Sequence, residues 1–115
     1  PWGDTPLESI AFKIPTITTN LSGFGAWVET VDNYNRGISD GVAVLERTDH
    51  NYGEIVDAIC RTISDYAQLG SKEINRTRNR ASQLSDRALW SKFIEAYYEA
   101  YALAFTNRDI RIDSI

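Results

Sequence analysis

Several residue types are scarce or missing in this 115-residue chain, and each scarcity excludes a class of protein. The chain has no methionine, a single cysteine, Cys60, and a single histidine, His50. A lone cysteine excludes an internal disulfide and is typical of a reducing compartment, so we expect a cytoplasmic protein. One cysteine and one histidine are too few for a zinc site.

Long apolar runs are also missing. No stretch approaches the roughly 18 apolar residues of a membrane-spanning helix, and the first residues show no secretory signal pattern, so we expect no membrane partner. Hydrophobic residues nevertheless make up 43% of the chain, which is ordinary for a folded domain and too high for a disordered segment. The length predicts one small domain or part of a larger one.

Charge is unevenly distributed along the chain. The formal net charge is −4, but residues 71–92 hold six basic side chains against only two acidic ones. A basic band inside an acidic chain favours a local anionic partner and argues against general affinity for nucleic acid. The six basic residues of this band are Lys72, Arg76, Arg78, Arg80, Arg87 and Lys92.

The first residues predict a helix that begins with a cap. Thr5 is suited to cap it, Pro6 suits its first position, and Glu8 stands three residues after the cap. We expect this helix to end near Lys13, because Pro15 cannot continue it. A glycine before a helix N-terminus also suits a diphosphate, because unpaired amides meet the ligand there. Capping alone explains the same pattern.

Two short strands are predicted after this helix. Residues 16–19 are β-branched throughout, and residues 41–47 form an apolar run without alternation, which is typical of a buried parallel strand. Between them we expect a glycine turn at 22–25, a short helical piece near 26–28 and a polar loop over 30–40. His50 is expected to be exposed.

The second half predicts three helices. Asn51 and Glu54 form a capping-box pattern for a helix that ends at Gly70, with Cys60 on its buried stripe. Ser71 begins a second helix, which carries the basic band opposite Ile74, Ala81 and Leu84. Ser85 is expected to cap a third helix, which continues to Phe105. We expect its aromatic positions to form a core stripe rather than a sugar platform, and these include Tyr97, Tyr98 and Tyr101.

The order of these elements predicts an α/β fold with about two parallel strands and a large share of helix. Two strands are too few for a stable sheet, so we expect further strands upstream in a longer protein. An exposed sheet edge and bare apolar patches predict self-association of the isolated chain.

Two blocks of sequence carry a resemblance to a known family. The first runs from Pro1-Trp2-Gly3-Asp4-Thr5-Pro6-Leu7-Glu8 to Thr18-Thr19-Asn20-Leu21-Ser22-Gly23-Phe24-Gly25. The second is Arg78-Asn79-Arg80-Ala81-Ser82-Gln83-Leu84-Ser85-Asp86-Arg87-Ala88-Leu89-Trp90. Both resemble glycogen synthases of the animal and fungal type in order and spacing.

The resemblance implies a GT-B glycosyltransferase, which has two Rossmann-like lobes, with this chain as the C-terminal part of the nucleotide-sugar-binding lobe. Residues 1–50 would hold the donor-site helix, strands and loops, residues 51–106 the three C-terminal helices, and residues 107–115 a tail. The parent protein would transfer glucose, with retention, from a nucleotide-glucose to the 4-hydroxyl end of an α-1,4-glucan. In that architecture the last helix crosses back to the other lobe.

The resemblance also implies roles for residues of the first block. The donor would be bound by Trp2, Gly3, Asp4, Thr5 and Glu8, with Thr5 at the diphosphate and Glu8 at the ribose hydroxyls. The first glutamate of the family's pair would fall one position before Pro1, so we expect no catalytic residue in this chain and an inactive fragment. The donor would be UDP-glucose or ADP-glucose, and the acceptor would be glycogen or a related α-glucan. The resemblance implies no metal and no cofactor.

Two departures from the family pattern affect these implications. Asp4 stands where the family usually has tyrosine, and a carboxylate beside a diphosphate is repelled by about 1 kcal/mol near a wet surface. The family's dense arginine run, which binds glucose 6-phosphate, is largely missing from residues 71–77. We expect that control to be weak or absent. Arg76, Arg78 and Arg80 are candidates for an anion or regulatory site, or form a solvated face with ion pairs.

Two other functions remain open from the sequence. One is a different GT-B transferase, such as a sucrose- or trehalose-phosphate-forming enzyme, against which the Ser22–Gly25 turn and the second block argue. The other is a non-catalytic helical interaction module that binds an anionic partner through residues 72–87. Synthesis of a disaccharide would favour the first, and a stable monomer that ignores nucleotides would favour the second.

Overall fold

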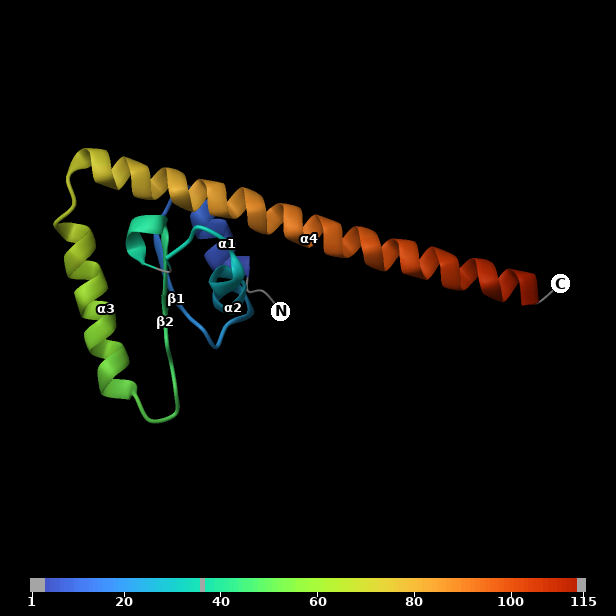
Figure 1. Ribbon diagram of the computed structural model, residues 1–115, viewed down its shortest axis with the longest axis horizontal. Coiled ribbons are helices and arrows are strands. Elements are labelled where there is room, and N and C mark those ends of the chain that lie inside the picture. The colour runs from blue at the N-terminus through green and yellow to red at the C-terminus, as the bar shows by residue number, and fades with distance from the viewer. Residues whose placement is uncertain (1–3, 36, 114–115) are drawn as a thin grey trace.

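The computed structural model describes residues 4–35 and 37–113, in which helices alternate with two short strands (Figure 1). The elements in chain order are α1 (Asp4–Ala11), β1 (Thr16–Thr19), α2 (Gly23–Thr30), a 3-10 turn η1 (Ile38–Asp40), β2 (Val42–Leu45), α3 (Tyr52–Ala67) and α4 (Ser71–Asp113). The predicted α/β class, rich in helix, is confirmed.

The two strands pair in parallel, as predicted, with Thr16 opposite Val42 and Thr19 opposite Leu45. Parallel strands require a crossover, and α2 with η1 forms it. Figure 1 shows α3 on one side of the strands and α1 with α2 on the other. The sheet is therefore covered on both faces, which explains why β2 is apolar without alternation.

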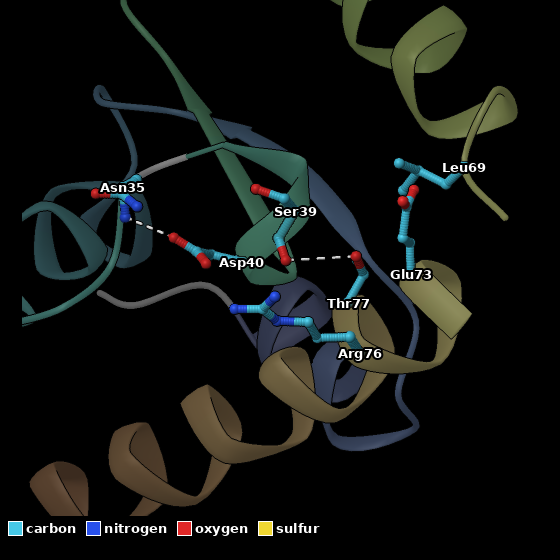
Figure 2. Close-up of a pocket in the computed structure, with 7 residues that line it drawn as sticks. All are labelled: Asn35, Ser39, Asp40, Leu69, Glu73, Arg76 and Thr77. Atoms are coloured by element: carbon cyan, nitrogen blue, oxygen red, sulfur yellow. Dashed lines mark hydrogen bonds between the residues drawn. The ribbon is translucent and has the colours of Figure 1, made fainter. Parts of the chain in front are cut away.

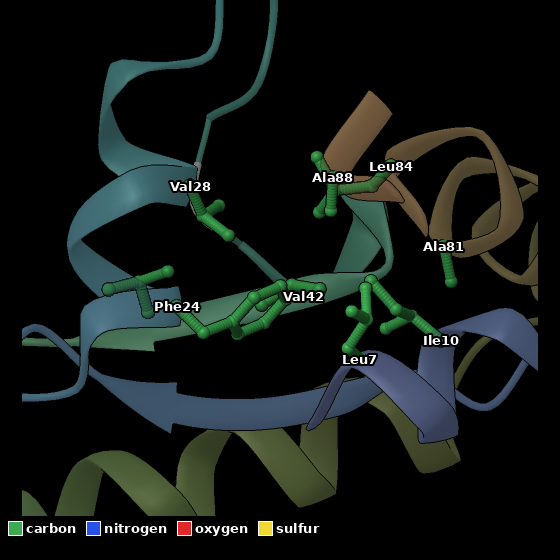
Figure 3. Packing of buried hydrophobic residues seen from close by; sticks show 9 residues of the cluster. Leu7, Ile10, Phe24, Val28, Val42, Ala81, Leu84 and Ala88 are labelled. Carbon is green, nitrogen blue, oxygen red and sulfur yellow. The ribbon is translucent and has the colours of Figure 1, made fainter. Parts of the chain in front are cut away.

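One compact core lies between the sheet, α1, α2 and the first half of α4 (Figure 3). Each helix contributes residues spaced three or four apart, which places them on a single face. Full burial of such a side chain stabilises the fold by about 1.5–3 kcal/mol. The cluster consists of Leu7, Ile10, Phe24, Val28, Val42, Val44, Ala81, Leu84 and Ala88.

The last helix corrects two predictions. α4 is continuous over 43 residues, so the break predicted at Ser85 is wrong, and the expected tail is helical as far as Asp113. Ser85 is 2% exposed and lies in the helix interior. Residues 71–113 contain no glycine or proline, so this candidate cap residue has no helix breaker beside it. A helix of this length spans about 64 Å, and the chain extends 69 Å along its longest axis.

The second half of α4 extends beyond the rest of the molecule (Figure 1). Tyr97, Tyr98 and Tyr101 are 56%, 66% and 55% exposed, so the prediction that they form a core is wrong for this chain alone. The apolar positions do recur with helical spacing, but no other segment among the described residues covers them.

Three further predictions concern single residues. α1 begins at Asp4, so Thr5 lies inside the helix rather than at its cap. Asn51 does precede α3, but its side chain makes no cap hydrogen bond. It binds instead the Glu46 carbonyl and the Thr48 amide. Cys60 is exposed, contrary to prediction, and His50 is exposed as predicted.

Candidate functional site

The N-termini of α1 and α2 both lie at the edge of the sheet where the two strands end. The chain reverses between α1 and β1 over residues 12–15, so the N-terminus of α1 points toward the edge where β1 and β2 end. α2 starts at the same edge, four residues after β1 ends at Thr19. In α/β folds with parallel strands, ligands bind outside this edge, and helix N-termini present unpaired amides to anions.

Two of the predicted donor-binding residues lie on the exposed side of α1. Thr5 and Glu8 are exposed, while Leu7 and Ile10 on the opposite side are buried in the core. The helix is thus anchored by its apolar face and presents a hydroxyl and a carboxylate outward, three residues apart. Trp2, Gly3 and the side chain of Asp4 lie outside the described residues. The donor-site assignment stays a prediction.

Residues 22–25, predicted as a glycine turn, form the cap and the first residues of α2. The Ser22 hydroxyl accepts a hydrogen bond from the Gly25 amide at 2.8 Å and donates to the Thr19 carbonyl at 3.0 Å. Phe24 is fully buried in the core. The predicted bounds of the turn, 22–25, are wrong, because α2 already begins at Gly23, and Ser22 is a helix cap that sequence reasoning missed.

Two glycines permit backbone approaches that no other residue would allow. A Cβ atom at Gly25 would lie 1.9 Å from the Thr19 carbonyl oxygen, and one at Gly41 would lie 2.4 Å from the Ala81 amide nitrogen. Gly41 also has a φ of 92°, a left-handed conformation that favours glycine. These contacts hold α2 against the end of β1 and α4 against the start of β2.

The guanidinium of Arg80 is embedded in the chain's own loop. It lies 4.4 Å from the centre of the Tyr34 ring and donates to the Asn33 carbonyl at 2.7 Å. It also pairs with Asp40, at 3.4 Å between Nη2 and Oδ1. Burial raises the pKa of Tyr34, against the opposing effect of the Arg80 and Arg87 charges. Arg80 therefore joins α4 to residues 33–40.

The other basic side chains of α4 diverge. Arg78 donates to the Lys13 carbonyl at 3.1 Å, on the opposite side of the helix from Arg80. Arg87 donates to the Asp32 carbonyl at 3.4 Å. Successive positions turn by about 100° around a helix, so residues two apart cannot share a face. Arg78 therefore faces away from Arg76 and Arg80, which are four residues apart. The assignment of these three arginines to an anion or regulatory site stays a prediction.

Arg76 lines a separate hollow of about 340 Å³ between η1 and the first turns of α4 (Figure 2). Thr77 and Ser39 line it together, and the Thr77 hydroxyl donates a hydrogen bond to the Ser39 carbonyl at 3.3 Å. Asp40 and Glu73 also line this hollow, and Asp40 is already paired with Arg80, so Arg76 and Glu73 bring opposite charges to it. Such a mixture of charges does not favour a strongly anionic ligand.

Two kinds of feature are absent from the described residues. No three histidine, cysteine, aspartate or glutamate side chains within residues 4–35 and 37–113 converge on a point where they could hold a metal ion. No helix in the same ranges is long and apolar enough to cross a membrane.

Comparison with known proteins identifies the family. The family model described as glycogen synthase matches residues 1–109. The chain belongs to the glycogen synthase family. Glycogen (starch) synthase isoform 2 of Saccharomyces cerevisiae is 32% identical over 104 residues, which cover 90% of this chain and 15% of the yeast protein. Glycogen (starch) synthase of Neurospora crassa is 31% identical over 104 residues, 90% of this chain and 14% of that protein.

An animal member of the glycogen synthase family is more distant. The human liver glycogen (starch) synthase is 27% identical over 99 residues, which cover 86% of this chain and 14% of the human protein. The chain therefore spans about one seventh of the length of the curated relatives that it matches. The region that the family model matches, residues 1–109, includes both blocks that carry the resemblance.

Proposed function

We propose that this chain is the C-terminal part of the nucleotide-sugar-binding lobe of a retaining glycogen synthase of GT-B architecture. The parent protein would transfer glucose from a nucleotide-glucose to the 4-hydroxyl end of an α-1,4-glucan. One observation carries the proposal above all others. The family match includes the whole of α1, on which Thr5 and Glu8 are exposed at the carboxyl-end edge of the sheet.

The chemistry of these residues supports a role in donor binding. The amides at the start of α1 and the Thr5 hydroxyl would bind the diphosphate, since a helix N-terminus carries about half a positive charge. Glu8 would accept hydrogen bonds from two ribose hydroxyls, since a carboxylate offers two acceptor oxygens. Trp2 and Gly3 would shape the pocket, and Asp4 would weaken diphosphate binding unless it points to solvent.

The experiment uses the full-length protein that contains this chain. Labelled glucose transfer onto glycogen is measured separately from UDP-glucose and from ADP-glucose. Glu8→Ala is compared with Glu54→Ala, because Glu54 is also an exposed glutamate in the first turns of a helix. A hydrogen bond to a charged group contributes about 1.5–3 kcal/mol, so Glu8→Ala is expected to lower kcat/KM by about ten- to hundredfold.

Each outcome assigns or rejects a part of the proposal. Transfer from one donor that is lost in Glu8→Ala and kept in Glu54→Ala supports both the reaction and the role of Glu8. Equal activity of the two variants contradicts the role of Glu8. Disaccharide synthesis without elongation of glycogen contradicts the glycogen synthase reaction and favours another GT-B transferase.

The interaction-module alternative receives less support. It needs the basic band to be available to an anionic partner, but Arg78, Arg80 and Arg87 all donate hydrogen bonds to carbonyls of the same chain. Releasing them would break the contacts between α4 and the loops beside it.

A further inference from the structure

Two asparagines stand in the loops at the carboxyl-end edge of the sheet, where β1 and β2 end. Asn20 directly follows β1, and Asn51 lies in the loop between β2 and α3. Both are half-buried, and both accept a hydrogen bond from a backbone amide on the side-chain oxygen. The donor to Asn20 is the Arg47 amide at 2.9 Å. The donor to Asn51 is the Thr48 amide at 2.8 Å.

The side chain of Asn20 continues the connection between the two strands. Its backbone amide donates to the Leu45 carbonyl at 3.0 Å, and its side-chain oxygen accepts from Arg47, two residues farther along. This second bond also fixes the orientation of the carboxamide, because a backbone N–H can only donate and must face the oxygen. The NH2 group of Asn20 is therefore directed away from the Arg47 amide.

The NH2 group of Asn51 is used within the chain, and that of Asn20 is not. Nδ2 of Asn51 donates to the Glu46 carbonyl at 2.8 Å. Nδ2 of Asn20 donates to no acceptor among the residues that the structure describes. It is open to solvent, because within the same part of the chain the buried side-chain nitrogen without a partner is Nε of Arg80. Asn20 thus presents two oriented N–H donors outward.

The position of these donors favours a substrate as their acceptor. Ligands of parallel α/β folds bind outside the carboxyl ends of the strands, and Asn20 is the first residue after such an end. The N-terminus of α1 points toward the same edge, and α1 packs against β1. An NH2 group can only donate, so it is complementary to a group that can only accept. The diphosphate proposed for this edge is such a group.

We propose that Asn20 is a further donor-binding residue, whose NH2 group donates a hydrogen bond to a diphosphate oxygen of the nucleotide-glucose. The inference rests on the proposed function and adds a residue to which the resemblance assigns no role. The oxygen of the same carboxamide holds the Arg47 amide, so the bound diphosphate would be connected through one side chain to the loop that follows β2.

Binding of UDP and of ADP to the full-length protein that contains this chain tests the proposal, because each nucleotide carries a diphosphate and no glucose. Titration calorimetry measures Kd for the unsubstituted protein and for Asn20→Asp. This substitution keeps an oxygen for the Arg47 amide and replaces the NH2 group by a second oxygen. It is expected to weaken binding of the nucleotide by about ten- to hundredfold, because a charge-assisted hydrogen bond is replaced by repulsion.

Asn51→Asp is the matched control. It adds the same charge at the same edge of the sheet, on an asparagine whose NH2 group already donates to the Glu46 carbonyl. It is expected to change Kd by less than about threefold, because a charge near water is screened. It is also expected to lower the unfolding temperature, because an oxygen would replace the donor to that carbonyl. Asn20→Asp is expected to keep the unfolding temperature of the unsubstituted protein.

Each contrary result has its own meaning. Equal changes of Kd in the two variants would make Asn20 an ordinary hydrated side chain and overturn the proposal. A lower unfolding temperature of Asn20→Asp with an unchanged Kd would show that another part of the parent protein accepts from its NH2 group. Weaker binding of the nucleotide-glucose alone would move the contact from the diphosphate to the glucose. If the unsubstituted protein binds neither nucleotide, the proposed function fails, and this inference fails with it.

Discussion

Tyr34 and Arg80 hold each other in two ways. The Tyr34 hydroxyl donates a hydrogen bond to the Arg80 carbonyl at 3.0 Å, while the Arg80 guanidinium lies 4.4 Å from the centre of the Tyr34 ring. The two residues are 46 positions apart in sequence. Their contact joins α4 to the loop before η1. It gives Arg80, a candidate anion-binding residue from the sequence, a structural role.

Arg80→Ala is expected to destabilise the fold by about 1–3 kcal/mol, because it removes the hydrogen bond to the Asn33 carbonyl and the cation–π contact. Urea unfolding measures the free energy of unfolding. Arg76→Ala is the control, since Arg76 is exposed on the same helix, and it is expected to change stability by less than about 0.5 kcal/mol. Equal effects of the two substitutions would contradict the structural role of Arg80.

Tyr34 links stability to alkaline pH. Burial raises its pKa in the folded chain, while in the unfolded chain a tyrosine titrates near pH 10. Above about pH 10 the unfolded state loses this proton first, so Tyr34 favours unfolding as the pH rises. Below that pH its contribution is constant. Absorbance titration of the phenols should show one late tyrosine, which disappears in Tyr34→Phe.

Gly25→Ala is expected to destabilise the chain by about 3 kcal/mol or more, because overpacking against rigid backbone cannot relax. The new Cβ would lie 1.9 Å from the Thr19 carbonyl oxygen. Gly53→Ala is the matched control, since Gly53 lies in α3 and its added methyl group would have nothing within 4 Å. It is expected to stabilise the chain by about 0.5–1 kcal/mol. Thermal unfolding distinguishes the opposite signs.

Glucose 6-phosphate is expected to activate the full-length protein weakly or not at all. Arg78 and Arg80 are engaged with the Lys13 and Asn33 carbonyls, and Arg76 shares its hollow with Asp40 and Glu73. Transfer of labelled glucose with and without the sugar phosphate measures the effect. A change larger than about fivefold, typical of allosteric coupling, would show that these side chains release their contacts to bind it.

Part of the candidate site was predictable from local sequence. The presence of α1, its end before Pro15, and the exposed position of His50 follow from local preferences and polarity. Phe24 and Val28 stand four residues apart, which places two apolar side chains on one helix face, and both are in the core. The cap role of Ser22 was also within reach, because serine is among the residues preferred at helix N-caps.

Other features depended on contacts distant in the sequence. Cys60 was expected on a buried stripe, but α3 covers only a two-stranded sheet, so one turn of its face is buried at Ile55 while Val56 and Ile63 are 40% and 57% exposed. The structural role of Arg80 depends on its contacts with Tyr34 and Asp40. No local sequence pattern indicates that these residues lie close together.

The sequence by itself determined the α/β class, the parallel pairing of two apolar or β-branched strands, the membership of the glycogen synthase family, and the amphipathic periodicity of α4. These follow from side-chain volume, polarity and spacing, which are properties of neighbouring residues. Only the tertiary structure decided that α4 continues through Ser85, that three of its arginines donate to carbonyls of the chain's own loops, and that Tyr97 and Tyr101 are left exposed. Those outcomes depend on which distant surfaces meet, and a straight helix can bury only the side that the rest of the chain reaches.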